Sequence, residues 1–163
     1  MQARRVVLTA SFLGLFGFAG LFANYGARAS ASFEIETRNQ SNMPTSVSTL
    51  LTRNLNDVFG ENDPVRRRKA IDEIFTQDAV FYDPKGGVYR GRDEIDRVAG
   101  ELRGMHHDFR YQPIGEPKEV GNGGRVRWTE GRPDEAPAVA GTDFIVARDG
   151  RIAAVYLFFD KLP

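Results

Sequence analysis

The stretch 138-AVAGTDFIVARDGRIAAVYLFF-159 decides the fold of this chain. Two apolar runs, Ala138 to Ala147 and Ile152 to Phe159, flank the short polar segment Arg148-Asp149-Gly150. An Asp-Gly pair between two such runs is a strong signal of a β-hairpin, because these residues tolerate the positive φ of a tight turn. The stretch therefore predicts two antiparallel strands near the carboxyl end.

A period of two continues upstream of this hairpin. Phe109 alternates with Tyr111, and Val126 alternates with Trp128, as expected of strands with one buried face. The glycine-rich segment Asn122-Gly123-Gly124 predicts a further hairpin turn. We therefore expect an antiparallel meander in the second half of the chain.

Helical spacing dominates the first half instead. A first helix is predicted from about Leu51, and Asp63-Pro64 is typical of the N-cap and first residue of a second helix. The second helix can turn Ala70, Ile71, Ile74 and Phe75 inward. A strand at 79–82 and a short segment at 88–90 follow, and a third helix runs from about Asp93 to Gly104. Helices followed by a meander indicate the α+β class.

The charged residues argue against a nucleic-acid-binding protein. The run Arg66-Arg67-Arg68-Lys69 lies on the predicted second helix, where Arg68 can pair with Asp72 and Lys69 with Glu73. The whole chain has 22 basic and 22 acidic residues. We therefore interpret the run as a solvated helix face and expect no nucleic-acid partner.

The N-terminus has the order of a secretory signal. Arg4 and Arg5 precede the uncharged segment Val6 to Ala23, and Ala29-Ser30-Ala31 follows with small residues. This order predicts a signal peptide over 1–31 and export to the periplasm or the extracellular space; an uncleaved membrane anchor is the alternative. A flexible linker over 32–47 and a folded domain over 48–163 are expected next.

The cysteine and histidine content limits the chemistry expected of this chain. The chain has no cysteine, which excludes disulfides and thiolate chemistry. His106 and His107 are adjacent, so in extended chain they point to opposite sides, and no other pattern of metal ligands accompanies them. We expect no metal and no cofactor, and treat one histidine as a possible acid or base at the rim of a site.

Several motifs together resemble the SnoaL-like domain of the nuclear transport factor 2-like superfamily, which includes polyketide cyclases, ketosteroid isomerase and limonene epoxide hydrolase. They are Asn62-Asp63-Pro64, Ala79 to Pro84, Tyr89 to Ile95, Gly141-Thr142-Asp143 and Asp149 to Ile152. The resemblance covers Ser48 to Pro163. It implies a strongly curved, mainly antiparallel sheet wrapped as a cone around three helices, with a ligand pocket at the wide end. Members are often dimers through the sheet, so a homodimer is expected.

The same resemblance implies roles for three side chains. Asp83 is similar in position to the general base of ketosteroid isomerase, and Asp143 to its second, protonated acid. The isomerase also uses a phenol from its first helix, whereas the matching position here is Asn54 or, one register on, Leu55. This departure argues against a steroid isomerase. An amide at Asn54 can still donate a hydrogen bond to a carbonyl oxygen.

The residues themselves leave alternatives open for both acids. Asp83 precedes Pro84, which favours extended geometry and an inward carboxylate, but an aspartate here can also simply start a turn. Asp143 interrupts an apolar run with the inward parity of Ile145, so it needs a partner or a proton; it is either functional or structural. If both acids share one pocket, repulsion separates their pKa values into one base and one acid.

The predicted function is a cofactor-free isomerase, cyclase or hydrolase for a small apolar molecule with a carbonyl, epoxide or similar oxygen. Asp83 would move the proton, while Asp143 and Asn54 would bind the oxygen. A non-catalytic module for ligand binding or dimerisation is the alternative. Residues at alternate strand positions are expected to line the pocket: Phe81, Phe109, Tyr111, Trp128, Ile145, Val155, Leu157 and Phe159.

Overall fold

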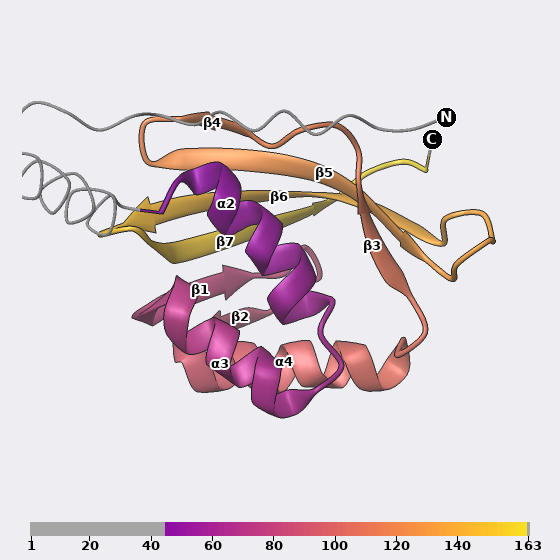
Figure 1. The fold of residues 1–163 in the computed structure, drawn as a ribbon, viewed down its shortest axis with the longest axis horizontal. Coiled ribbons are helices and arrows are strands. Elements are labelled where there is room, and N and C mark those ends of the chain that lie inside the picture. Colours follow the sequence, from indigo (N-terminus) through magenta and orange to yellow (C-terminus); the bar gives the residue numbers. More distant parts are fainter. Residues whose placement is uncertain (1–44, 163) are drawn as a thin grey trace, which may run out of the picture. The chain divides into compact units, whose positions relative to one another are not determined.

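Seven strands form one sheet in the computed structural model, which describes residues 45–162 (Figure 1). The strands lie in the order β2-β1-β7-β6-β5-β3, and β4 pairs with β5 beside β3. Their bounds are β1 Phe75–Tyr82, β2 Val88–Arg90, β3 Arg110–Pro113, β4 Lys118–Val120, β5 Gly123–Gly131, β6 Val139–Arg148 and β7 Arg151–Phe159. The meander predicted in the second half of the chain is confirmed.

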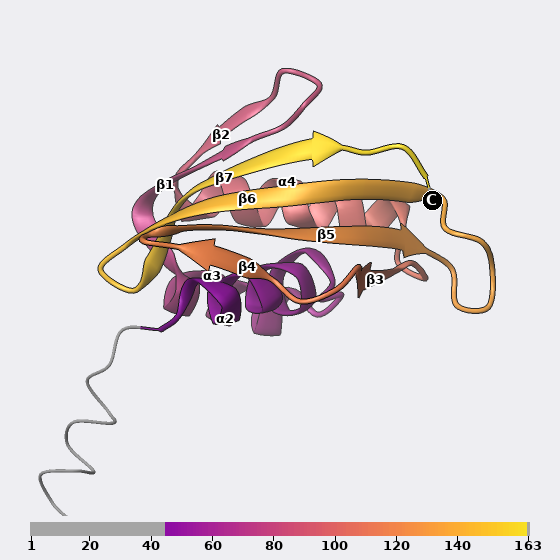
Figure 2. The same cartoon turned by 90° about the horizontal axis from the view of Figure 1, so that it is seen from above.

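Three helical segments lie on one side of this sheet, as the two views show (Figures 1 and 2). They are α2 Val47–Arg53, which continues as the π-helix η1 Asn54–Phe59, then α3 Pro64–Ile74 and α4 Gly91–Met105. One hydrophobic core fills the space between the helices and the sheet. The α+β class and the curved sheet over three helices are therefore confirmed.

The hairpin of β6 and β7 has the predicted turn. Arg148 pairs with Arg151, and the two residues between them, Asp149 and Gly150, have φ of 53° and 71°. Positive φ at both central positions gives the turn the twist of the flanking strands. Asp63 is likewise the predicted N-cap of α3: its Oδ1 accepts hydrogen bonds from the amides of Val65 and Arg66.

The second predicted turn, Asn122-Gly123-Gly124, starts and ends earlier in the chain than expected. Gly121, with φ of 57°, and Asn122 form the turn. Gly123 and Gly124 already belong to β5, where they pair with β4 and β6. A Cβ at Gly124 would lie 2.6 Å from a methyl group of Val47 on α2. Gly124 therefore permits the close approach of this helix to the sheet, which is a packing role and not a turn role.

Strand β1 is longer than predicted. Phe75, expected on the inner face of the second helix, is instead the C-cap of α3 and the first residue of β1. β1 pairs antiparallel with β2 but parallel with β7, with Phe81 beside Val155. The parallel pairing brings the end of β1 to the end of β7, which is where the site described below lies.

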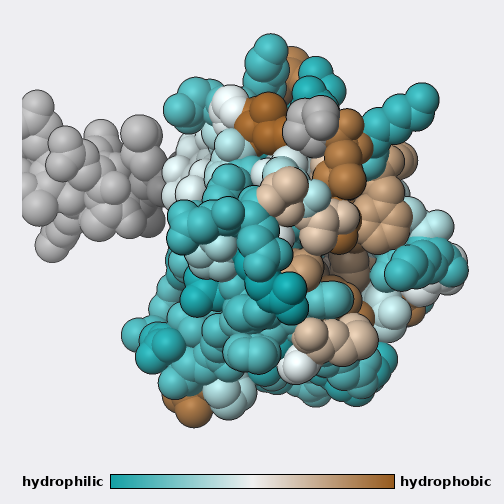
Figure 3. Space-filling model, turned by 90° about the vertical axis from the view of Figure 1, so that its right-hand side faces the viewer, coloured by the Kyte–Doolittle hydropathy of each residue, from teal (hydrophilic) through white to brown (hydrophobic). Residues whose placement is uncertain are grey.

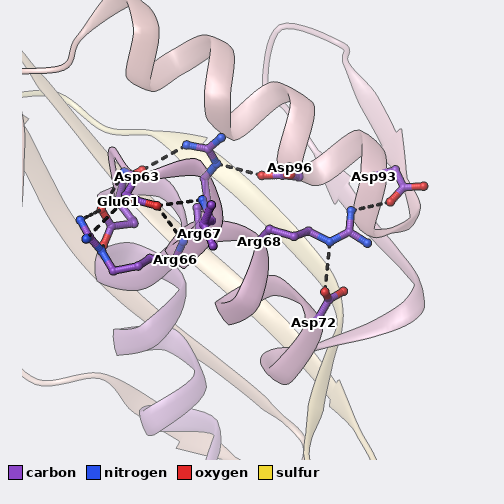
Figure 4. Close-up of polar contacts among 9 residues, drawn as sticks. Glu61, Asp63, Arg66, Arg67, Arg68, Asp72, Asp93 and Asp96 are labelled. Atoms are coloured by element: carbon purple, nitrogen blue, oxygen red, sulfur yellow. Dashed lines mark hydrogen bonds and ion pairs between the residues drawn. The ribbon is translucent and has the colours of Figure 1, made fainter.

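The basic run on α3 is only partly a solvated face (Figure 4). Arg68 pairs with Asp72 at 3.1 Å as predicted. Arg67 is buried instead: its Nε donates to Asp96 on α4 at 2.9 Å. Glu73, the predicted partner of Lys69, accepts a hydrogen bond from Arg53 at 2.7 Å. Arg67 lies on the side of α3 that faces α4, so its ion pair with Asp96 joins the two helices.

The predicted signal peptide over 1–31 and most of the linker over 32–47 lie outside the described residues. Ser46 caps α2 with its side chain, and the helix begins at Val47, one residue before the predicted start of the domain. Within 45–162, no helix combines the length and the apolar character needed to cross a membrane.

Candidate functional site

A small cavity opens at the end of the domain where β1 and β7 end. Its volume is about 20 Å³, which is room for about one water molecule. Apolar side chains gather on this end of the surface (Figure 3). Helices, β1 and the meander all contribute to the wall, which consists of Leu55, Phe59, Phe81, Leu102, Tyr111, Trp128, Asp143 and Leu157.

Asp143 is the only carboxylate in this wall, and two side chains hold it. Nε1 of Trp128 donates to its Oδ1 at 2.9 Å, and Nδ2 of Asn54 donates to its Oδ2 at 2.9 Å. All three residues are buried, with Asp143 only 5% exposed. Each carboxylate oxygen therefore accepts one hydrogen bond from the protein and keeps a lone pair for a ligand.

Local structure places each member of this triad. Asp143 lies in the middle of β6, between Val126 on β5 and Leu157 on β7, and alternation turns it toward the helices. Asn54 begins the π-helix η1, a type of helix that often occurs at functional sites. Gly141 leaves room for the indole of Trp128, since a Cβ there would lie 2.5 Å from the ring.

Burial raises the pKa of Asp143 to about 6. The hydrogen bonds from Trp128 and Asn54 act in the opposite direction, because they stabilise the ionised form, but desolvation is the larger effect. A carboxyl group with this pKa exchanges its proton readily near neutral pH, which suits it to acid-base chemistry.

Asp83 lies in the turn after β1 and does not line this cavity. Its Oδ1 accepts a hydrogen bond from the amide of Lys85 at 2.6 Å, and its backbone pairs with Gly87 and Gly86. Tyr82 pairs with Tyr156, so the register brings Asp83 level with Leu157, which in turn pairs with Asp143. Two strand spacings therefore separate the acids, about 10 Å between backbones.

The predicted pocket residues fall into three groups. Phe81, Tyr111, Trp128 and Leu157 line the cavity. Ile145 and Val155 are fully buried in the core farther from the opening. Phe109 stacks on His106, with ring centroids 4.6 Å apart, and Phe159 is half exposed, so neither lines the wall.

Sequence reasoning missed the helical half of the wall. Leu55, Phe59 and Leu102 line the cavity, although they belong to helix faces that look like ordinary core. Leu55 and Phe59 lie on η1, four residues apart, and Leu102 lies near the end of α4. The helical spacing indicates their inward direction, but nothing local distinguishes a cavity wall from packed core.

A second inward carboxylate, Glu130, was also missed. Glu130 has the parity of Trp128 on β5 and pairs directly with Tyr111 on β3. Burial raises its pKa, while Arg103, with Nη1 3.5 Å away, lowers it. Burial, then Glu130 and Asp143, raise the pKa of Tyr111 well above 10, so its phenol keeps its proton. The alternation of Val126, Trp128 and Glu130 along the sequence is the signal that indicates an inward direction for Glu130.

The two histidines follow the end of α4 and are exposed. His106 stacks on Phe109, and the carbonyl oxygen of His107 accepts hydrogen bonds from Asn62 and Arg103. Over the described residues, no group of three or more potential metal ligands comes together.

The comparisons with known proteins agree with this fold. The family model of the SnoaL-like domain matches residues 52–155. No curated protein matches the chain. A candidate isomerase of the SnoaL-like family from Agrobacterium tumefaciens is 26% identical, with a TM-score of 0.65, covering 69% of this chain and 96% of that one.

Two further solved structures show the same fold at lower identity. A candidate polyketide cyclase from Sinorhizobium meliloti is 24% identical, with a TM-score of 0.53, covering 67% of this chain and 93% of that one. A candidate ketosteroid isomerase from Kribbella flavida is 18% identical, with a TM-score of 0.56, covering 70% and 77%. Because the family model covers most of the folded domain, the chain belongs to the SnoaL-like domain family.

Proposed function

We propose that this protein is a cofactor-free acid-base enzyme in which Asp143 transfers the proton. One observation carries the proposal: a fully buried carboxyl group with a pKa of about 6 faces a small apolar cavity. Such a group takes up and releases a proton near neutral pH, and the dry wall around it strengthens its interaction with a substrate.

We assign the proton transfer to Asp143 and not to Asp83, because Asp143 lines the cavity whereas Asp83 lies in the turn after β1, outside its wall. Asn54 and Trp128 hold the carboxyl group in one orientation. Tyr111, whose phenol stays protonated, is the donor available in the wall for a substrate oxygen. The reaction class is isomerisation, cyclisation or hydrolysis of a small apolar molecule.

Turnover by matched variants tests this proposal. Mass spectrometry of the purified chain identifies any molecule that it retains, and that molecule is assayed beside small ketones and epoxides. Asp143→Asn is expected to lose about 10²-fold or more in kcat, whereas Asp83→Asn, which also replaces one carboxylate by an amide, keeps the wild-type rate. Equal rates of wild type and Asp143→Asn would remove Asp143 from the mechanism, whereas the absence of turnover by wild type on all of these compounds would favour a non-catalytic binding module.

Export and dimerisation belong to the same proposal. The order of basic, apolar and small residues before Ala31 supports export, and mass spectrometry of the secreted protein should find 1–31 removed. Outward-facing aromatic side chains on the sheet support a homodimer: Tyr82 stacks on Tyr156, with centroids 4.7 Å apart, and Phe158 is 54% exposed. Light scattering of wild type and Phe158→Ser tests the dimer.

A further inference from the structure

The two inward carboxylates near the cavity differ in their charge balance. Glu130 has a counter-ion, because Nη1 of Arg103 lies 3.5 Å from its Oε1. Asp143 has none: within 45–162 no basic side chain forms an ion pair with it, and its two partners are the neutral groups of Asn54 and Trp128. The wall of the cavity thus holds one unpaired acid.

This imbalance has an energetic consequence at neutral pH. Asp143, with a pKa of about 6, is then mostly ionised although it is buried. A buried anion without a counter-ion is costly, since two neutral hydrogen bonds replace only part of its lost hydration. A cation that enters the cavity offsets more of this cost than a neutral hydrogen-bond donor of the same size does.

The rest of the wall also favours a cation. Four aromatic rings from four elements surround the cavity: Phe59, Phe81, Tyr111 and Trp128. Phe59 and Phe81 are tilted by 53° with centroids 5.2 Å apart, and Tyr111 meets Trp128 at 76° with centroids 5.0 Å apart. The faces of aromatic rings attract organic cations, and a wall of aromatic and aliphatic carbon atoms suits the methyl groups of an alkylammonium ion better than it suits a hydrated metal ion.

We propose that the cavity binds a small alkylammonium ion, whose charge pairs with Asp143 and whose carbon atoms contact the aromatic wall. The inference rests on the proposed function, since it uses the same cavity and the same carboxyl group, and it narrows the substrate class to small amines. The cavity has room for about one water molecule, so even the smallest of these ions requires the wall to open. Leu102 and Leu157, which are partly buried wall residues, are the side chains that we expect to move.

Cations and neutral molecules of equal size provide the test. Methylammonium is compared with methanol, and tetramethylammonium with tert-butanol, at pH 7.5 on the full chain. Trp128 is the only tryptophan, and its indole N–H donates to Asp143, so its proton NMR signal reports both binding and the titration of this acid. In at least one pair the cation is expected to bind tenfold or more tightly than its neutral counterpart.

Two controls separate charge from size. The preference for the cation should disappear at pH 5, where Asp143 is protonated, and in Asp143→Asn, but persist in Asp83→Asn. Phe59→Leu, which keeps an apolar side chain but removes the ring, should weaken binding of the cation more than binding of the neutral molecule. The pH 5 measurement needs no variant, so it holds even if Asp143→Asn fails to fold.

Three outcomes overturn the inference. Equal binding of cation and neutral molecule, a preference that survives at pH 5, or no binding of either cation each rejects the amine class. The same spectra judge the proposed function separately, because the titration of Asp143 appears in the Trp128 signal without any ligand. A titration near pH 6 with no preference for a cation leaves an acid-base site for neutral substrates.

Discussion

Asn54 and Asp143, 89 residues apart in the sequence, are joined by a hydrogen bond of 2.9 Å from Nδ2 to Oδ2. The bond links the start of η1 to the middle of β6 at the wall of the cavity. The other amide atom, Oδ1 of Asn54, is buried without a hydrogen-bond partner. When Asp143 is protonated, rotation of the Asn54 amide turns this oxygen toward the acid as an acceptor. Asn54 can therefore form a hydrogen bond with either protonation state of Asp143.

The ionisation of Asp143 should be visible without any substrate. Because Trp128 donates to this carboxyl group and is the only tryptophan, its fluorescence should change with a midpoint near pH 6. Asp143→Asn should abolish the transition, and Asp83→Asn should retain it. A wild-type midpoint near 4 would mean that the carboxyl group is well hydrated and not enclosed as described.

The same pKa predicts how stability depends on pH. In the unfolded chain Asp143 has an ordinary pKa near 3.9, whereas in the folded protein the pKa is about 6. The folded state therefore binds more protons between these values, and the stability contributed by the proton is present below pH 4 and lost as pH rises through 6. Asp143→Asn should remove this loss, on the order of 3 kcal/mol.

Urea unfolding of wild type and Asp143→Asn at pH 4 and at pH 7.5 measures this difference. The variant should gain stability relative to wild type as pH rises. A relative stability that is flat across this range would show that Asp143 has the same pKa in the folded and unfolded chain.

Replacement of Asn54 by leucine tests the hydrogen bond between helix and sheet. The bond from Asn54 lowers the pKa of Asp143, so Asn54→Leu should move the Trp128 fluorescence midpoint above that of wild type. The free energy of unfolding at pH 7.5 should fall by about 1 kcal/mol, because the lost bond is partly offset by removal of the unpartnered Oδ1. An unchanged midpoint would assign the stabilisation of the ionised form to Trp128 alone.

Much of the fold could be predicted because its signals are local. Asp63-Pro64 starts α3, Asp149-Gly150 closes the last hairpin, and both follow from backbone conformations that these residues favour. The turn at Gly121 was displaced because glycine at 124 serves packing against α2, which is a tertiary effect. A local pattern cannot separate the two uses of glycine.

The site was less predictable, since it depends on contacts between distant segments. The inward parity of Asp143 follows from its strand, but its partners Asn54 and Trp128 come from other elements. Asp83 resembled a general base by its motif, while the structure shows its carboxylate accepting a bond within its turn. Small differences in how the side chains pack decide whether a wall encloses a cavity or a solid core. The periodicity of the sequence does not predict such differences.

The buried arginine of α3 should matter more than its exposed neighbour. Arg67→Met leaves Asp96 without its partner and is expected to cost about 3 kcal/mol in urea unfolding. Arg66→Met, the matched change next to it, should leave the unfolding midpoint nearly unchanged, because the ion pair of Arg66 with Glu61 is at the surface. Equal effects of the two variants would contradict the burial of Arg67 between α3 and α4.

Gly141 should control the position of the Trp128 indole. A Cβ at this position would lie 2.5 Å from Cζ2 of Trp128 and 2.9 Å from the carbonyl oxygen of Phe158, so Gly141→Ala has to displace the ring. Overpacking of this kind costs about 1–3 kcal/mol. The bond from Trp128 lowers the pKa of Asp143, so its loss should raise the fluorescence midpoint above 6. Gly104→Ala on α4, where a Cβ meets no atom within 4 Å, is the matched control and should leave the midpoint unchanged. If Gly141→Ala has the same midpoint as Gly104→Ala, the indole still donates to Asp143 in the variant. The contact between Trp128 and β6 would then be looser than the 2.5 Å distance implies.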